Sequence, residues 1–503
     1  MLPSPAAVAS SAITLAAGVS RDYLLYHRLC PRARRDDGTV VVAVAPDALP
    51  DGVEDALDDL AFAYRSTVTS EVAPADEVER LIERLTTHAE RTIELARANA
   101  GSDTDDLTAD VRDLANQPPV VRYVNLLVRD ASDAQASDIH LEATRSGLSA
   151  RFRVDGVLAP APEPPASLHH AVVSRIKLLA ELDIAERRRP QDGRIRVRLE
   201  ARELDLRVST VPTMYGESVV LRLLDRGGAP VSLAELGMSA PVLATLESLA
   251  RRPHGMLLVT GPTGSGKTTT LYAALQTRDA QREKIITVED PVEYQLLGIT
   301  QVPVHRQAGV VFGSALRAIL RQDPDVVMVG EMRDAETAEV AIQAAMTGHL
   351  VFSTLHTNDA IGAIPRLLDL GVPEFLVAAT VEGVLAQRLV RRVCDACRSP
   401  YEPSAESLAI LEKVSGGSLA QTRFSQGTGC AQCRGTGFRG RLGVFELLIM
   451  SDELRDAIAQ HVGRSALRAL ALRSGMVPLR GDGWLKAQAG LTTVEEVLRA
   501  VHE

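Results

Sequence analysis

Residues 261–268 read GPTGSGKT, a complete G-x-x-x-x-G-K-[ST] pattern. An apolar run at 256–260 precedes it, and residues 269–275, which suit a helix, follow it. In this strand–loop–helix context the glycines let successive backbone N–H groups close around phosphate oxygens, and the helix dipole adds to the attraction. A chance glycine-rich turn would not require these flanks. We therefore expect nucleotide phosphates to bind residues Gly261, Pro262, Thr263, Gly264, Ser265, Gly266, Lys267, Thr268 and Thr269.

Two residues of this loop and one acid downstream predict hydrolysis as well as binding. Lys267 should reach the β and γ phosphates, and the Thr268 hydroxyl should ligate Mg²⁺. Hydrolysis also needs an acidic group that polarises water. Residues 325–331 (DVVMVGE) form an apolar run that ends in Glu331, with Gly330 where such strands usually carry aspartate. Glu331 is expected to serve Mg²⁺, the attacking water or both.

Three more acids, Glu289, Asp290 and Glu293, follow the apolar run at 284–288. In open α/β sheets, ligands bind beyond the carboxyl ends of the strands. Because the same edge should carry the phosphate loop, we expect these acids to belong to the active site. Acids in loops are often merely solvated, and that alternative stays open.

The cysteines indicate a metal site. Four of the five form two C-x-x-C pairs separated by 32 residues, a pattern that can supply four thiolates to a tetrahedral Zn²⁺. Gly435 and Gly437 would ease the tight turn after the second pair. Reduced or redox-active pairs are the alternative. The expected zinc ligands are Cys394, Cys397, Cys430 and Cys433.

Charge and hydropathy limit the remaining possibilities. Residues 1–115 contain 11 basic and 21 acidic residues, against 44 of each in the rest of the 503-residue chain. This acidity and an aromatic content of only 3% disfavour a nucleic-acid-binding protein. No apolar run approaches the roughly 18–20 residues of a membrane span, and residues 1–20 lack the basic start of a signal peptide. We expect a cytoplasmic protein that begins with a small acidic α/β domain, including a strand near 39–45.

Four ordered blocks resemble those of one family. They are GPTGSGKTTTLY (261–272), TVEDPVEY (287–294), LRAILRQDPDVVMVGEMRD (316–334) and TGHLVFSTLHTND (347–359). These blocks are similar to the Walker A, Asp box, Walker B and His box of the secretion ATPase superfamily, which includes type II secretion, type IV pilus and natural-competence motors. The resemblance covers residues 117–503.

Blocks outside this core resemble the family's second N-terminal domain: ASDIHLE (136–142), FRVDGVL (152–158), QDGRIRVR (191–198) and LRVSTVPTMYGESVVLRLLD (206–225). The resemblance implies an α/β fold with a RecA-like P-loop ATPase core, a pair of smaller α/β (PAS-like) N-terminal domains and a tetracysteine zinc subdomain. The implied boundaries are 1–115 for a partner-docking domain, 117–230 for the second domain, 232–390 for the core, 391–440 for the zinc subdomain and 441–503 for a helical end.

The family also implies cationic residues that act on phosphate. Its second domain and its core supply arginines within and across subunits, and a planar guanidinium pairs well with phosphate oxygens. Salt bridges to nearby acids are the alternative. The matching residues are Arg207 and Arg222, together with Arg317 and Arg321, which we expect at i and i+4 on one helix face.

His349 and His356 match the His box, where the family uses histidine near the γ-phosphate. A structural role is the alternative for both.

The resemblance thus implies a cytoplasmic hexameric ATPase that uses ATP, Mg²⁺ and Zn²⁺ to energise protein export. It would be peripheral to the inner membrane through a docking protein and a platform protein, without nucleic acid. Type IV pilus extension and competence-pilus assembly are the alternatives within the superfamily, and an N-terminal region of about 115 residues suits the secretion branch better. A RecA-like nucleic-acid motor and a zinc-stabilised scaffold that binds ATP without turnover remain as other classes.

Overall fold

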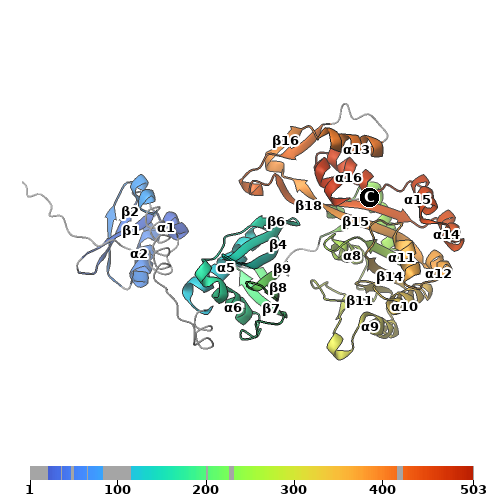
Figure 1. The fold of residues 1–503 in the computed structure, drawn as a ribbon, viewed down its shortest axis with the longest axis horizontal. Helices are drawn as coiled ribbons and strands as arrows, with labels where there is room; N and C mark the ends of the chain where they lie inside the picture. Colours follow the sequence, from blue (N-terminus) through green and yellow to red (C-terminus); the bar gives the residue numbers. More distant parts are fainter. Residues whose placement is uncertain are drawn as a thin grey trace, which may run out of the picture. The chain divides into compact units, whose positions relative to one another are not determined.

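The computed structural model describes residues 21–35, 37–46, 50–64, 66–82, 115–199, 202–225, 231–415 and 423–501. The chain forms two compact units, Met1–Asp110 and Val111–Glu503 (Figure 1). Within the described ranges, no helix is both long enough and apolar enough to cross a membrane.

The first unit is built around strand β2 (Val40–Val44), whose residues are all buried. Valine suits such a strand because its branched side chain packs well on a pleated surface. β2 pairs antiparallel with β1 (Leu29–Arg34) and parallel with β3 (Val68–Val72). Helices α1 (Arg21–His27) and α2 (Pro50–Tyr64) contact this sheet. The strand expected near 39–45 is confirmed.

The second unit begins with an antiparallel sheet of order β6-β5-β4-β9-β8-β7. Helices α5 (Pro118–Asp133) and α6 (His169–Leu179), the latter preceded by η1 (Ala166–Leu168), share one hydrophobic core with this sheet. Alternate residues of β4, β5, β7, β8 and β9 enter that core, so the opposite face carries mainly polar side chains. The strands are β4 (Ala136–Thr144), β5 (Gly147–Val154), β6 (Val157–Pro160), β7 (Gln191–Leu199), β8 (Arg202–Thr213) and β9 (Gly216–Asp225).

A seven-stranded sheet of order β12-β11-β13-β14-β10-β15-β18 follows. Its neighbouring strands are parallel except for β18, which runs antiparallel to β15. Every residue of β10, β13 and β14 is buried, as expected of strands covered on both faces. The strands are β10 (Gly255–Thr260), β11 (Ile285–Glu289), β12 (Thr300–Pro303), β13 (Val326–Val329), β14 (Leu350–Leu355), β15 (Val381–Val393) and β18 (Phe438–Ile449).

Helices cover both faces of this sheet (Figure 1). One face packs against α7 (Ala240–Ala250) and α8 (Lys267–Leu275). The other face packs against α9 (Phe312–Ile319), α10 (Ala335–Met346), α11 (Ala363–Asp369) and α12 (Glu374–Thr380). Short 3-10 turns η2 (Leu233–Leu236) and η3 (Arg306–Ala308) lie in the connections.

A small cysteine-bearing subdomain is inserted between β15 and β18. It contains η5 (Asp395–Cys397), β16 (Arg398–Tyr401), α13 (Ala405–Ser415), β17 (Phe424–Gly427) and η6 (Ala431–Cys433), with β16 and β17 antiparallel. The chain continues through α14 (Asp452–Ala459), α15 (Arg464–Arg473), α16 (Leu479–Gln488) and α17 (Val494–Ala500). The predicted fold class, an α/β protein with a tetracysteine cluster, is confirmed.

Candidate nucleotide-binding and metal sites

The phosphate loop joins β10 to α8, in the predicted order of strand, loop and helix. Gly261, Gly264 and Gly266 have φ angles of 152°, 78° and 86°, which glycine adopts at low cost. Gly266 also lies against β15, because a Cβ there would be 2.8 Å from Gln387 Nε2. The backbone conformation therefore favours glycine at position 266.

Lys267 and Ser265 give the loop its polar interior. Lys267 Nζ donates hydrogen bonds to the carbonyl oxygens of Gly261 at 2.8 Å and Pro262 at 3.0 Å. Burial lowers the pKa of Lys267 to about 8, although the Glu331 carboxylate opposes this shift. Ser265 Oγ is buried and has no hydrogen-bond partner in the described structure. A buried ammonium beside an unsatisfied hydroxyl suits an incoming anion. Thr268 and Thr269 follow, half-buried, in the first turn of α8.

Glu331 and His356 follow β13 and β14, so they lie at the same carboxyl edge as the phosphate loop. Glu331 Oε2 is 3.3 Å from His356 Nε2 and 2.6 Å from Arg333 Nε. Thr260 at the end of β10 is tied to the His356 loop, because the backbone N–H of Thr357 donates to Thr260 Oγ1 at 2.8 Å. The fold thus brings the lysine, the acid and the histidine together.

Glu289 lies at the same edge, but its carboxylate is buried and hydrogen-bonded to other side chains. It is the last residue of β11 and is 3% exposed. Its carboxylate accepts hydrogen bonds from Tyr272 Oη, from Thr287 Oγ1 at 2.6 Å and from Gln301 Nε2 at 3.2 Å. These bonds use most of its acceptor capacity, so its surroundings are those of a structural carboxylate.

Asp290 and Glu293 are more accessible and pair with arginines. Asp290 Oδ2 is 3.0 Å from Arg306 Nη2. Glu293 Oε2 is 3.5 Å from Nη2 of Arg207, which lies on β8 of the six-stranded sheet. Of the three acids after 288, Glu293 is therefore the one that contacts an arginine predicted for the site.

The other predicted arginines contact different partners. Arg222 on β9 donates through Nε to Asp138 Oδ1 at 2.9 Å. Arg317 forms an ion pair with Glu336, and Arg321 donates to the Arg317 carbonyl at 2.9 Å. Arg317 and Arg321 are exposed on the flank of the core.

One helix does not carry both Arg317 and Arg321, so that expectation was wrong. Helix α9 ends at Ile319, and the 3-10 turn η4 (Leu320–Gln322) follows. The next residue, Asp323, has a φ of 53° and precedes Pro324. A residue before proline is disfavoured in the helical region, which accounts for the end of the helical turns at Gln322.

His349 does not lie at the carboxyl edge of the sheet, where the phosphate loop lies. His349 precedes β14 whereas His356 follows it, and a strand of that length spans about 20 Å. His349 Nδ1 lies 2.9 Å from the Ala344 carbonyl and 3.1 Å from Thr347 Oγ1. Its ring therefore closes the carboxyl end of α10, which is the structural alternative.

The predicted zinc ligands converge. The Sγ atoms of all four cysteines lie within 4.8 Å of one another, with neighbouring pairs at 3.7–3.9 Å. Tetrahedral Zn²⁺ with Zn–S bonds of ~2.3 Å places its sulfurs roughly 3.8 Å apart. Gly435 and Gly437 have φ angles of 79° and 75°, as the turn required. The amides of Cys430 and Gly437 donate to Cys433 Sγ, which favours its thiolate.

Sequence reasoning missed two polar residues behind the phosphate loop. Gln387 Oε1 accepts a hydrogen bond from Thr270 Oγ1 at 2.6 Å, and Arg388 Nη2 donates to the Asn358 carbonyl at 2.8 Å. Both are buried on β15. A Gln-Arg pair inside the apolar run at 381–393 was the available signal, because buried polar side chains need partners.

A largely parallel sheet whose carboxyl edge carries this loop, a buried lysine and an acid after β13 is the arrangement found in P-loop nucleotide-binding proteins. The chain belongs to the family described as Type II/IV secretion system protein, whose model matches residues 113–499.

Similarity to named proteins supports the same family assignment. The chain is 47% identical over 493 residues to Type II secretion system protein E of Xanthomonas campestris pv. campestris, covering 97% of this chain and 85% of the relative. It is 43% identical over 450 residues to the Type IV pilus assembly ATPase PilB of Myxococcus xanthus, covering 88% of this chain and 80% of the relative. The crystal structure of the pilus retraction motor PilT with bound ADP matches 74% of this chain and 95% of that chain, with a TM-score of 0.52 and 27% identity. The predicted family is confirmed.

Proposed function

We propose that this protein is the ATP-hydrolysing motor of a type II secretion system. One observation carries the proposal: Lys267 and Glu331 share one sheet edge in a chain that is 47% identical, over 97% of its length, to a type II secretion system protein E. The type IV pilus ATPase is 43% identical, against 47% and 50% for the type II secretion system proteins E of Xanthomonas campestris pv. campestris and Pseudomonas aeruginosa, which favours the secretion branch.

The residues at this edge fit a magnesium nucleotide. Lys267, now bonded to loop carbonyls, and the unsatisfied Ser265 hydroxyl supply positive charge and a hydrogen-bond donor for phosphate oxygens. Thr268 and Glu331 would hold Mg²⁺, which offsets negative charge on the phosphates when bound. Glu331, whose side chain is 14% exposed, also orients the attacking water, while His356 supports its carboxylate from 3.3 Å.

The arginines divide into two groups. Arg207 and Arg222 extend from the six-stranded sheet and contact phosphate, and Glu293 already holds Arg207 at 3.5 Å. Arg317 and Arg321 are exposed on the flank of the core, and they serve the nucleotide of a neighbouring subunit in a homo-hexamer. Such arginines contribute about 10³–10⁵ in rate where they stabilise transition-state charge.

The tetracysteine cluster binds Zn²⁺ as a structural ion. Four thiolates leave no open coordination position for chemistry. The ion would fix the two C-x-x-C turns at the ends of the subdomain inserted between β15 and β18.

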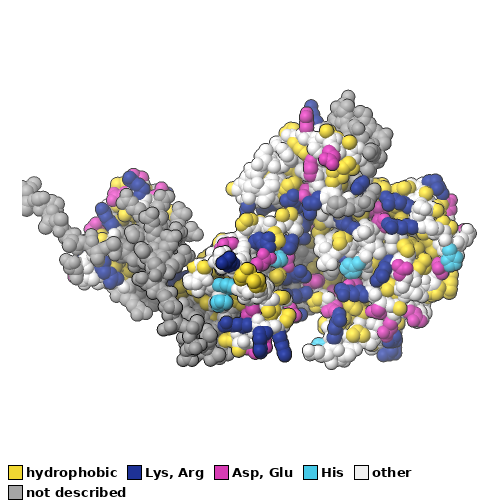
Figure 2. Space-filling model, in the orientation of Figure 1, with side chains coloured by type: hydrophobic (Ala, Val, Ile, Leu, Met, Phe, Trp, Pro, Cys, Tyr) yellow, Lys and Arg dark blue, Asp and Glu magenta, His cyan; other side chains and the backbone are white. Residues whose placement is uncertain are grey.

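The acidic N-terminal segment attaches the chain to the rest of the secretion system. Residues 1–115 carry the chain's whole excess of acidic residues and dock on an inner-membrane protein, while a platform protein receives the motion. The chain would then act in the cytoplasm, peripheral to the inner membrane. Figure 2 shows basic and acidic side chains intermixed on the visible face of the second unit, which does not favour a nucleic-acid motor.

A complementation experiment tests the pathway. In the native cell, deletion of the gene should abolish export of secreted proteins and leave pili intact. The wild-type chain should restore export, whereas Lys267→Ala should not. Loss of pili or of DNA uptake with normal export would assign the chain to pilus extension or competence instead.

A further inference from the structure

Three arginines lie side by side on one face of the six-stranded sheet. The strand register places Arg194 of β7 opposite Arg207 of β8, and Arg207 opposite Arg222 of β9. Directly opposed residues on antiparallel strands share a face, with Cβ atoms roughly 4.5–5.5 Å apart. The adjacent residues Ile195 and Leu221 are buried against the helices. The arginine row therefore lies on the face opposite α5 and α6.

Such a row of like charges is unfavourable unless an anion offsets it. Carboxylates already engage two members: Asp138 accepts from Arg222 Nε at 2.9 Å, and Glu293 lies 3.5 Å from Arg207 Nη2. Arg194 is exposed and makes no ion pair or side-chain hydrogen bond with any described residue. Its guanidinium can thus bind an added anion without first breaking a pair.

A groove of ≈ 470 Å³ lies over this row. That volume falls within the ~300–1,000 Å³ typical of small-molecule sites. The charged side chains in its lining are three arginines and one carboxylate, Asp192. The groove is lined by Asp192, Gly193, Arg194, Arg207, Val208, Ser209, Val220 and Arg222.

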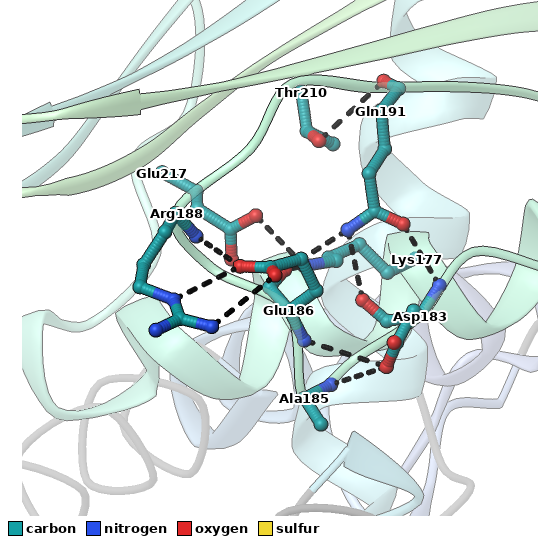
Figure 3. Close-up of polar contacts among 8 residues, drawn as sticks. All are labelled: Lys177, Asp183, Ala185, Glu186, Arg188, Gln191, Thr210 and Glu217. Atoms are coloured by element: carbon teal, nitrogen blue, oxygen red, sulfur yellow. Dashed lines mark hydrogen bonds and ion pairs between the residues drawn. The ribbon is translucent and has the colours of Figure 1, made fainter.

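Hydrogen bonds fix the start of β7 (Figure 3). Arg194 lies on the same strand. Lys177, fully buried, donates to Glu217 Oε1 and to the Glu186 carbonyl, each at 2.7 Å. Gln191, the first residue of β7, donates through Nε2 to the Asp183 and Glu186 carbonyls at 2.9 Å. The segment before Arg194 is therefore anchored to α6 and β9, which preorganises the arginine row.

We propose that Arg194 is a third phosphate-binding arginine, which acts with Arg207 and Arg222 as one clamp on the nucleotide triphosphate. The proposal rests on the proposed function, because the bound anion is the triphosphate of ATP. The contact between Arg207 and Glu293 places the row toward the core sheet edge that carries the phosphate loop.

Nucleotide kinetics of the full-length protein test this. Arg194→Ala should raise the KM for ATP at least ~10-fold, because it removes charge-assisted hydrogen bonds to phosphate oxygens. The matched control is Arg198→Ala, since Arg198 is also exposed, lies on the same face of β7 and does not line the groove. Arg198→Ala should stay within ~2-fold of wild type, as surface charges usually do. Equal KM values for the two folded variants would overturn the proposal.

A measurement on the wild-type chain avoids any folding defect of the variant. Arginines are modified with phenylglyoxal, with and without Mg-ATP, and the sites are quantified by mass spectrometry. ATP should protect Arg194 and leave Arg198 reactive. Equal reactivity of Arg194 in both samples would contradict the clamp.

Failure of the Arg194 proposal can be distinguished from failure of the proposed function. If the proposed function is wrong, wild type shows no ATP turnover and Lys267→Ala leaves ATP binding unchanged. If only the arginine proposal is wrong, turnover and the Lys267 effect persist while Arg194 behaves like Arg198.

Discussion

Two glutamates at one sheet edge differ in what surrounds them. Glu331 retains a partly exposed carboxylate beside His356, whereas Glu289 is buried and accepts hydrogen bonds from Tyr272, Thr287 and Gln301. A shared edge is therefore not enough to assign a chemical role. The free acceptor capacity of each carboxylate separates the hydrolytic candidate from the structural one.

Glu289→Gln tests this distinction. The amide would place a donor against Tyr272 or Gln301, so we expect a loss of about 1–3 kcal/mol in unfolding free energy. The kcat of the folded variant should remain within about tenfold of wild type, because a general acid–base group contributes more than that. Tyr272→Phe serves as the matched variant and should lower stability in the same direction. Unchanged stability with a kcat reduced a hundredfold would instead make Glu289 a chemical group.

Residues that form a local sequence pattern could be predicted from the sequence. The phosphate loop, Glu331 and the cysteines follow fixed local spacings, so their convergence was foreseeable. Gln387 and Arg194 were not found, because their partners are set by strand order and register rather than by nearby residues. The His349 prediction failed for a different reason: His349 precedes β14 and His356 follows it, so the two histidines lie at opposite ends of one strand.

Among the secondary-structure elements, α17 shows how the C-terminal helices are attached to the core sheet. The Glu496 carboxylate on α17 accepts hydrogen bonds from Arg391 Nη2 of β15 at 2.6 Å, from the Arg391 backbone N–H at 3.1 Å and from Arg499 Nη2 at 2.8 Å. Burial raises the pKa of Glu496, but these bonds outweigh burial and lower it to about 2.

This attachment should depend on pH. Because the folded pKa of Glu496 lies below its unfolded value near 4.5, its stabilisation is present above pH 4.5 and is lost as the pH falls toward 2. Glu496→Gln should cost about 3 kcal/mol at pH 7 and roughly 1 kcal/mol less at pH 4. Denaturant unfolding can be followed by the single tryptophan, Trp484, which shares a hydrophobic cluster with α17. An equal cost of Glu496→Gln at both pH values would contradict this attachment.

The four-cysteine cluster gives a second prediction at the level of a structural element. Purified protein should contain one Zn²⁺ per chain, and Cys430→Ser should lose it and unfold at lower temperature, because binding a structural metal contributes to folding. Cys30→Ala, which removes the cysteine outside the cluster, should keep the metal. A metal-free wild type with unchanged stability would refute the zinc assignment.

For the molecule as a whole, we expect the two units to have separate functions. Every residue assigned here to nucleotide or zinc lies in Val111–Glu503, while the acidic excess lies before residue 116. A fragment of residues 111–503 should therefore bind Zn²⁺ and bind ATP within about threefold of the full chain, since compact units often fold alone. It should lose capture of the inner-membrane docking protein. A fragment that folds and still captures that protein would remove the docking role from the first unit.

ATP turnover by the assembled protein with Mg²⁺ is the measurement on which the account rests. Glu331→Gln should bind ATP as wild type does yet hydrolyse it at least ~10²-fold more slowly, whereas Glu339→Gln, at an exposed acid on α10, should match wild type. Near-normal turnover in Glu331→Gln would contradict the account and move the role to Asp290 or Glu293.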